Sequence, residues 1–462
     1  MDSVPEFKVL ERCQISPPPG SVSPTSLPLT FFDIPWLLFP PNQPLFFYDF
    51  PHSTTHFNQT FLPALKHSLS LTLQHFFPLA GNLTAPPLST NPHLSYTDGN
   101  SLSLIIAEST ADFHYLSGHH HRQVEDFHHL APALSPCLSC DPHAHPLLAI
   151  QVTLFPNCGI CVGFKYHHVA ADGRTFNNFL KSWTSICSML IHHLSLPEVN
   201  KNKLSPCYDR SVIKDPNGFE SILLREWWNP KNSEKEVTST NAFDDMVRST
   251  FVMGRTDMQK LKQWIMTRSK NIPGSHPLLL SPYVLTCSLV WVCLIKTLWA
   301  DNVSMGKDPE PHYFGFIAGG ITRLDFPVPT NYFGNCVGFG RSMAMRSELL
   351  EENGIVFAAK AIGDTIKKLD RGILENAENW IREWKVFSSS ELHVMVVGSP
   401  KLEQYGLDFG WGKPRKIEEG SIDKTRAISL CECRDMEGGI EIGLALPKAK
   451  MDAFTKSLNH LF

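Results

Sequence analysis

The first half of the chain contains two apolar, β-rich runs followed at once by an amphipathic stretch. The runs cover 147–155 and 159–166, and a turn-forming Pro-Asn-Cys-Gly sequence separates them. This arrangement predicts a β-hairpin. Bulky apolar side chains then recur at the helical period, at Phe176, Leu180, Trp183 and Cys187. We therefore expect a hairpin that leads directly into a helix.

The same order of elements returns near the C-terminus. The segments 427–433 and 440–446 have the composition of strands, Glu437-Gly438-Gly439 joins them, and a helix is predicted over about 450–461. The two halves share this pattern and almost no sequence identity. A repeated hairpin–helix unit of this kind predicts two similar α/β domains of mixed sheet with flanking helices.

A stretch without sustained periodicity lies between the two halves. Residues 209–236 contain Pro216, Pro230 and many charges, which is typical of a linker. We therefore predict an N-terminal domain over 1–208, a crossover over 209–236 and a C-terminal domain over 237–462.

Two further helices are predicted from apolar spacing. Residues 58–77 carry Phe61, Leu65, Leu69 and Phe76, and Pro63 then has to lie in the first turn. The uncharged run 278–295 contains polar residues, and Ser281-Pro282 forms a good cap and first turn. We interpret it as a buried helix over about 282–299; a membrane span is the alternative.

Composition narrows the class of protein. The chain has 462 residues, of which 42% are hydrophobic and 19% charged, and this is a globular composition. A formal net charge of -4 provides no basic surface for nucleic acid. The N-terminus lacks the basic and apolar regions of a secretory signal, and the 12 scattered cysteines fit reduced thiols. We therefore expect a cytoplasmic protein without a membrane anchor.

The sequence contains cysteines and clustered histidines that could suggest a metal site, but their spacing does not favour one. Cys137 and Cys140 form a CxxC, but no second CxxC completes a zinc site. The histidines at 119–121, 128–129, 143 and 145 lack ordered spacing and lie in a polar, proline-containing stretch. A solvated loop is the preferred interpretation, and a zinc protein stays as an alternative.

The sequence His167-His168-Val169-Ala170-Ala171-Asp172-Gly173-Arg174 is the clearest chemical feature. It lies where the second strand of the hairpin ends and the helix begins, a common place for catalytic groups. A nearby helix N-terminus disfavours a protonated imidazole, so His168 would stay neutral and act as a general base. The alternatives are a hydrogen-bonded core histidine with Asp172 as a simple N-cap, or a metal ligand.

Two other motifs are weak when taken alone. Asp408-Phe409-Gly410-Trp411-Gly412 alternates glycines with aromatic residues, which suits a tight and closely packed loop. Asn331-Tyr332-Phe333-Gly334-Asn335-Cys336 indicates only a loop that contains a glycine. The first of these motifs on its own favours a structural turn.

Taken together, these motifs resemble the BAHD family of plant CoA-dependent acyltransferases. The family's hallmarks are H-x-x-x-D-G near the middle of the chain and D-F-G-W-G near its end, which correspond here to 168–173 and 408–412. Segments 27–33, 76–83 and 286–291 are also similar, so the resemblance covers essentially the whole chain. The Y-F-G-N-C sequence at 332–336 and the segment 209–216 are similar to the clade that acylates anthocyanins and other phenolic glucosides.

The resemblance implies a fold like that of chloramphenicol acetyltransferase. Two α/β domains joined by a long crossover would enclose a tunnel, with CoA on one side and the acceptor on the other. One stretch departs from the family, where Asp-x-Arg-x-Arg is common before Y-F-G-N-C. Here the sequence is Gly319-Gly320-Ile321-Thr322-Arg323, so it is open whether Arg323 can pair with Asp172 as an arginine of this region does in the family.

The resemblance also assigns roles to residues. His168 would be the base, Asp172 would fix the backbone that presents it, and the Trp411 indole N–H would stabilise the oxyanion. Arg174 suits a donor with a terminal carboxylate, such as malonyl-CoA. The remaining acyl-CoA contacts are predicted at Lys262, Ser281, Thr286 and Asn335, and structural roles in the motifs at Gly173, Asp408, Gly410 and Gly412.

The function predicted from the sequence is transfer of an acyl group, preferably malonyl, from CoA to a sugar hydroxyl of a flavonoid or other phenolic glucoside. No acyl-enzyme, metal or permanently bound cofactor is expected, and acyl-CoA serves as co-substrate. We expect a monomer. The alternatives are a hydroxycinnamoyl-CoA-dependent transferase of the same fold and a catalytically silent small-molecule binder.

Overall fold

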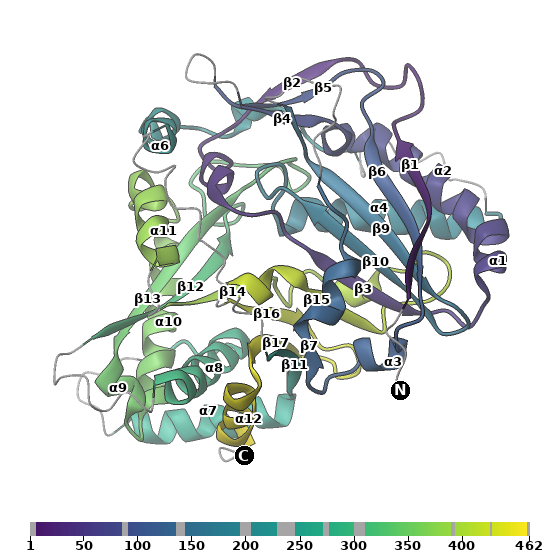
Figure 1. The fold of residues 1–462 in the computed structure, drawn as a ribbon. Helices are drawn as coiled ribbons and strands as arrows, with labels where there is room; N and C mark the ends of the chain where they lie inside the picture. The colour runs from purple at the N-terminus through teal and green to yellow at the C-terminus, as the bar shows by residue number, and fades with distance from the viewer. Residues whose placement is uncertain are drawn as a thin grey trace.

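The computed structural model of the protein describes residues 6–85, 91–134, 144–194, 205–228, 245–270, 277–299, 310–389, 393–425 and 427–459. These residues form two large mixed sheets and a small one (Figure 1). Cys137, Cys140 and His143 lie outside the described residues.

The first large sheet belongs mainly to the N-terminal half. Its strand order is β1-β6-β9-β10-β3-β15. The strands are β1 (Phe7–Ile15), β6 (Leu102–Ser109), β9 (Leu148–Phe155), β10 (Gly159–Tyr166), β3 (Pro44–Asp49) and β15 (Lys416–Glu419). β6 and β9 run parallel, and β9 and β10 form the predicted antiparallel hairpin.

The second large sheet belongs mainly to the C-terminal half. Its order is β13-β12-β14-β16-β17-β11-β7. The strands are β13 (Val337–Met345), β12 (Pro311–Gly319), β14 (His393–Val397), β16 (Ala427–Glu432), β17 (Ile440–Pro447), β11 (Met246–Met253) and β7 (Arg122–Gln123). A small sheet contains β2 (Thr25–Pro28), β5 (His93–Tyr96), β4 (Asn82–Thr84) and β8 (Ala144–Pro146).

Helices flank both large sheets. Those of the N-terminal half and the crossover are α1 (Thr54–His56), α2 (Leu62–His75), α3 (Phe113–Leu116), α4 (Gly173–Ile191) and α6 (Phe219–Trp227). Those of the C-terminal half are α7 (Arg255–Ser269), α8 (Pro282–Trp299), α9 (Arg346–Leu350), α10 (Gly354–Arg371), α11 (Trp380–Ser389) and α12 (Lys448–Asn459). Shorter 3₁₀ turns include η1 (Ile34–Leu38), η3 (Phe77–Ala80), η4 (Val124–Leu130), η5 (Arg210–Val212), η8 (Ala377–Asn379), η9 (Gln404–Gly406) and η10 (Gly420–Lys424).

The predicted repeat of hairpin and helix is confirmed. β9–β10 leads into α4, and β16–β17 leads into α12. The helix predicted over 58–77 is α2, which begins after a π-helical turn over Phe57–Phe61 and has Pro63 in its first turn. α8 packs against α10 and α12 as a buried helix. Within the described residues no helix is both long and apolar enough to cross a membrane.

Each half contributes one short strand to the sheet of the other half. β15 pairs with β3 in the first sheet, and β7 pairs with β11 in the second. Figure 1 shows both strands in the middle of the molecule, where the two halves meet. A division of the chain at 209–236 therefore does not separate the two sheets, and this predicted linker itself contains α6.

Candidate active site

His168 lies just after β10 and just before α4. Its Nδ1 is 3.0 Å from Asn335 Oδ1. Asn335 Nδ2 is the donor to Asp33 Oδ1 at 2.9 Å and to the His168 backbone oxygen at 3.0 Å, so Asn335 Oδ1 is left as an acceptor. His168 Nδ1 therefore carries the proton, and Nε2 keeps the lone pair that a general base needs.

Asn335 belongs to a network that draws on three parts of the chain. Its backbone N–H also donates to Asp33 Oδ1, at 3.0 Å. Asp33 Oδ2 accepts from the Thr30 backbone and hydroxyl, and Arg210 Nη1 lies 3.7 Å from it. Asn335 and Asp33 are fully buried. The network fixes the tautomer and orientation of His168, so Asn335 has a positioning role here instead of the predicted contact with acyl-CoA.

Burial is the main influence on the protonation of the His168 imidazole. Burial lowers the pKa of His168 to about 4, although Asp172, the bond to Asn335 and Asp33 act in the opposite direction. The sequence predicts a different cause for a neutral imidazole, namely the nearby N-terminus of a helix. The side chain still retains partial exposure, and Nε2 makes no hydrogen bond with the described part of the chain.

Asp172 caps α4 and ties the two halves together. Its Oδ1 accepts from the Thr175 backbone N–H at 2.8 Å, and its Oδ2 accepts from that of Cys336 at 3.2 Å. Arg323 does not reach it, because its guanidinium bonds to Asp370 at 2.7 Å and to the Gly319 carbonyl at 2.8 Å. The cation beside Asp172 is Arg174, at 3.7 Å.

We predict that Asp172→Ala lowers both stability and turnover. Loss of the N-cap should cost about 0.5–2 kcal/mol of unfolding free energy. Asp172→Asn is the matched variant, because asparagine caps as well as aspartate but offers a single acceptor oxygen. Thermal unfolding and kcat measure the effect. Turnover that collapses at unchanged thermal stability would instead assign Asp172 a direct part in the reaction.

Trp411 lies at the wrong end of the sheet to stabilise an oxyanion. Its ring packs on Tyr48, Phe50, Phe57, Phe61 and Phe409. The Phe50 backbone N–H bonds to the Cys158 carbonyl, just before β10, whereas His168 follows the other end of this strand. The 8 residues of β10 span about 26 Å. The predicted catalytic role of Trp411 is therefore corrected to one in the core.

The contacts of the D-F-G-W-G loop indicate a structural role. Asp408 Oδ1 accepts from the backbone N–H groups of Gly410 and Gly412, at 2.8 and 2.9 Å. Both glycines have φ above +100°, at +107° and +112°, where side chains are strained. A Cβ on Gly410 would lie 3.1 Å from atoms of Ser188 and Ile191, at the far end of α4 from His168.

We predict that Gly410→Val lowers the free energy of unfolding by about 1–3 kcal/mol or more, through backbone strain and crowding against α4. Gly406→Val is the control, since a Cβ at Gly406 meets nothing within 4 Å and its φ is not in the strained range. Urea unfolding compares the two. A Gly410→Val protein of normal stability that has lost catalysis would show that the loop takes part in the chemistry.

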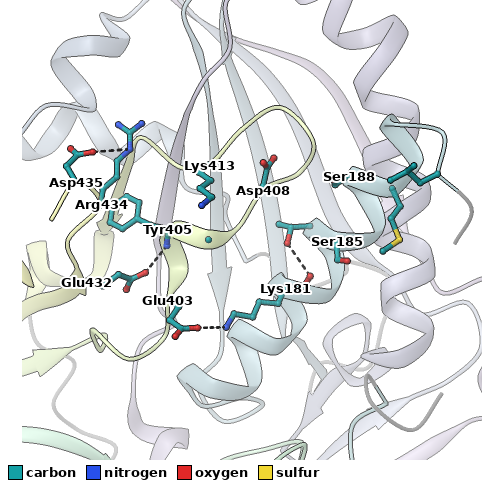
Figure 2. A pocket seen from close by; sticks show the side chains of 14 residues that line it. Lys181, Ser185, Ser188, Glu403, Tyr405, Asp408, Lys413, Glu432, Arg434 and Asp435 are labelled. Carbon is teal, nitrogen blue, oxygen red and sulfur yellow. Dashed lines mark hydrogen bonds and ion pairs between the residues drawn. The ribbon is translucent and has the colours of Figure 1, made fainter. Parts of the chain in front are cut away.

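An open groove of about 840 Å³ lies beside this loop. Figure 2 shows Lys181 of α4 bonded to Glu403 across it, with Asp408 and Lys413 at its edge. His168 is not part of its lining. The groove follows the C-terminal half of α4, whereas His168 precedes the N-terminus of this helix.

The other predicted CoA contacts are not brought together with His168. Lys262 is exposed on α7. Ser281 Oγ accepts from the Val284 backbone N–H at 3.3 Å and so caps α8. Thr286 has 0% exposure inside the core around α8, which corrects its prediction as a binding residue. Gly173 is the first residue of α4, and a Cβ there would only touch Leu402, at 3.4 Å.

No cluster of three or more histidine, cysteine or acidic side chains with metal-binding geometry occurs among the described residues. The structure thus combines two mixed sheets flanked by helices with a histidine, His168, that is held by Asn335 at the junction of the two halves.

Comparisons with known proteins identify the family. The sequence matches the model of the Transferase family over residues 9–461. It is 39% identical to the malonyl-coenzyme A:anthocyanin 3-O-glucoside-6''-O-malonyltransferase of Dahlia pinnata, covering 99% of this chain and 98% of that protein. It is 38% identical to the coumaroyl-CoA:anthocyanidin 3-O-glucoside-6''-O-coumaroyltransferase 2 of Arabidopsis thaliana, covering 98% and 97%. The chain belongs to this family, the BAHD acyltransferases, and is an acyl-CoA-dependent enzyme.

Solved structures confirm the predicted fold class. Vinorine synthase superposes with a TM-score of 0.68 at 18% identity, covering 99% of this chain and 98% of that one. The TRI101 protein of F. graminearum, complexed with ethyl coenzyme A, gives a TM-score of 0.62 at 13% identity, covering 93% and 96%.

Proposed function

We propose that this enzyme transfers a malonyl group from malonyl-CoA to a sugar hydroxyl of a phenolic glucoside, with His168 as general base. The observation that carries the proposal is the His168–Asn335 bond, which leaves Nε2 free for the acceptor in a chain of this family. Relatives over nearly the whole chain include the anthocyanin malonyltransferase of Dahlia pinnata and a phenolic glucoside malonyltransferase of Nicotiana tabacum at 39% identity.

In the proposed reaction Nε2 takes the proton of the sugar hydroxyl as its oxygen attacks the thioester carbonyl. The tetrahedral intermediate collapses with cleavage of the carbon–sulfur bond. The CoA thiolate leaves, and the protonated His168 returns the proton to it. Asn335 and Asp33 hold the ring throughout, because Nδ1 stays bonded to Asn335 while Nε2 gains and loses its proton. No covalent acyl-enzyme is required.

A hydroxycinnamoyl donor is the second candidate. The Arabidopsis relatives named as coumaroyltransferases are as similar to the chain as the malonyltransferases, at 38% identity. Aromatic rings also gather next to His168: Trp36 lies 4.8 Å from Phe39, and Phe39 lies 4.1 Å from Trp384, between ring centroids. Such rings suit either an aromatic donor or an aromatic acceptor.

A two-way panel tests the proposal. Malonyl-CoA, acetyl-CoA and coumaroyl-CoA are each offered with phenolic glucosides and with the matching aglycones, and products are read by mass spectrometry. We expect malonylated glucosides and no product from aglycones. Preference for coumaroyl-CoA would favour the second candidate. Acyl-CoA binding without turnover would mean a silent binder.

The hydrogen bonds of Arg174 favour a role other than the predicted recognition of the donor carboxylate. Its Nη1 donates to the Thr330 carbonyl at 2.7 Å and its Nη2 to that of Tyr332 at 2.8 Å. These bonds anchor the loop that carries Asn335, so the guanidinium is already engaged by protein oxygens. A positioning role for Arg174 is thus better supported than recognition of the donor carboxylate.

We predict that Arg174→Ala impairs malonyl-CoA and acetyl-CoA to a similar extent. Each lost hydrogen bond from the charged group should cost about 1.5–3 kcal/mol of loop stability. Arg174→Lys should rescue only part of the loss, since an ammonium lacks the planar fork. Steady-state kinetics with both donors provide the measurement. A rise in KM confined to malonyl-CoA would restore the donor-binding role.

We further propose a cytoplasmic monomer. The candidate site is assembled within one chain, because Asp33, His168 and Asn335 all belong to it. Buried thiols such as Cys187 and Cys287 in the two cores fit a reducing compartment. Light scattering of the eluting protein measures its mass, and a fluorescent fusion shows its compartment.

A further inference from the structure

Trp36 covers one face of the His168 ring. The two ring centroids are 3.6 Å apart and the planes differ by 14°. Aromatic pairs in proteins usually keep about 4.5–7 Å between centroids, so this stack is unusually close. Trp36 is itself 5% exposed, which means that the indole fills the space over the imidazole instead of lying on the surface.

The local fold explains why Trp36 reaches this place. It lies in the 3₁₀ turn η1, and its backbone N–H bonds to the Asp33 carbonyl at 3.1 Å. Side chains at i and i+3 of a 3₁₀ turn lie on the same face. Asp33 and Trp36 therefore point to the same side, where Asp33 holds Asn335 and Trp36 covers His168.

The indole of Trp36 also packs on a ring of the second sheet. Phe339 of β13 lies 5.3 Å from Trp36 between ring centroids. β13 begins two residues after Asn335, so one segment supplies both the hydrogen-bond partner of His168 and a ring that packs on Trp36. The tryptophan thus contacts both the His168 ring and a strand of the opposite half.

We propose that Trp36 is a positioning residue that fixes the plane of the His168 ring and excludes water from one of its faces. Asn335 controls rotation of the imidazole through Nδ1, and Trp36 prevents it from tilting. Together they aim the Nε2 lone pair along one direction. This inference rests on the proposed role of His168 as general base.

The stack also bears on the charge of His168. The carboxylates of Asp172 and Asp33 both face the imidazole environment and favour protonation, and each has an arginine nearby, Arg174 and Arg210. Burial outweighs the carboxylates and lowers the pKa of His168. Because the indole supplies part of this burial, its removal should let water reach the ring and raise the pKa.

The first test measures access to the ring without relying on activity. Diethyl pyrocarbonate modifies neutral imidazole nitrogens, and peptide mass spectrometry reads the rate at His168, with His168→Gln to assign the site. We expect Trp36→Leu to react several-fold faster at His168 and Trp36→Phe to fall between it and the wild type. Trp380→Leu is the matched control, since Trp380 is 4% exposed and packs on Phe339 and Phe32.

The second test separates orientation from general stability. Trp36→Leu should lower kcat by about 10- to 100-fold, because a misplaced base costs that much. In this variant the pH at which kcat/KM falls on the acid side should rise toward about 6.5, the ordinary pKa of histidine. Trp36→Phe should show a smaller rise. A variant that loses thermal stability but keeps the wild-type acid limb and modification rate would overturn the proposal. So would an equal change in Trp380→Leu.

The two hypotheses fail in distinguishable ways. If His168→Ala keeps its turnover, the general-base mechanism is wrong, whatever Trp36 does. If His168→Ala is inactive while Trp36→Leu keeps the wild-type kcat, pH profile and modification rate, the base stands and the positioning role of Trp36 is rejected.

Discussion

Replacing His168 by alanine should lower kcat by about 10²–10⁴-fold, the usual contribution of a general base. The loss is expected to fall on the chemical step, because the imidazole Nε2 is the only atom of the site that we assign to proton transfer. The KM for acyl-CoA should change little. Enzyme turnover with the best donor and acceptor of the panel gives the measurement.

The pH profile adds an independent signature. The pKa of His168 is lowered to about 4, mainly by burial, so the base is neutral in the folded enzyme above that pH. The acid limb of kcat/KM should therefore lie near pH 4 instead of near the ordinary value of about 6.5. Below about 6.5 the unfolded chain takes up a proton that the buried ring does not, so this histidine also makes the fold less stable as pH falls toward 4.

Folding controls make the result interpretable. His168→Gln keeps a side chain that can hydrogen-bond to Asn335, and it should retain the thermal stability of the wild type with the same loss of turnover. Near-normal kcat in either purified variant would reject His168 as the base. A large drop in unfolding temperature in both would mean that the loss of activity reports on folding.

The sequence predicted the elements whose signal is local. The strands of β9–β10 and β16–β17 and the helices α4 and α8 each carry their own periodicity, and the structure places them almost where expected. The exchange of β7 and β15 between the sheets was not predictable. Strands of 2 and 4 residues have no periodicity, and their pairing depends on partners far away in the sequence.

The sequence indicated the relation between two site residues only where both lie in the same short motif. His168 and Asp172 lie within one short segment, whereas the partner of His168 lies 167 residues away. Asn335 was predicted through the Y-F-G-N-C motif as a contact to acyl-CoA, and nothing in that motif reveals a hydrogen bond to a histidine so far away in the sequence. Asp33 and Trp36 were missed as site residues, although the similarity of 27–33 to the family was a usable signal. Trp411 shows the opposite error, because membership of a motif does not say which end of the sheet the motif occupies.

The second large effect is expected on stability, at the place where the two halves exchange short strands. Glu418 of β15 is 3% exposed and accepts from Arg122 Nη1 of β7 at 2.6 Å. Arg248 of β11 lies 3.3 Å from its other oxygen. Both arginines are as deeply buried as the glutamate. One carboxylate thus pairs with two guanidinium groups at the place where each half enters the sheet of the other, and Asp423, 2.7 Å from Arg248 Nη2, supplies a second negative charge.

Glu418→Ala should lower the free energy of unfolding by about 3–5 kcal/mol, since it leaves the buried guanidinium of Arg122 without its carboxylate partner, whereas Arg248 keeps Asp423. Glu418→Gln should lose less, because the amide oxygen can still accept a hydrogen bond. Asp364→Ala provides the surface control. Its partner Lys360 lies four residues earlier on α10 and both side chains are about half exposed, so about 0.5 kcal/mol or less is at stake.

The dependence on pH distinguishes a charge effect from a packing effect. Burial raises the pKa of Glu418, but the attraction of Arg122, Lys416 and Arg248 outweighs it and lowers the pKa to about 2. A glutamate in the unfolded chain has a pKa of about 4.3. The contribution of Glu418 to the free energy of unfolding is therefore complete above that pH and is lost as pH falls toward 2. Urea unfolding of the wild type and both variants between pH 7 and pH 3 therefore should show curves that converge at low pH. A stability difference that stays constant over this range would assign the loss to the cavity left by the side chain, and the ion pairs across the exchanged strands would then contribute little to holding the two halves together.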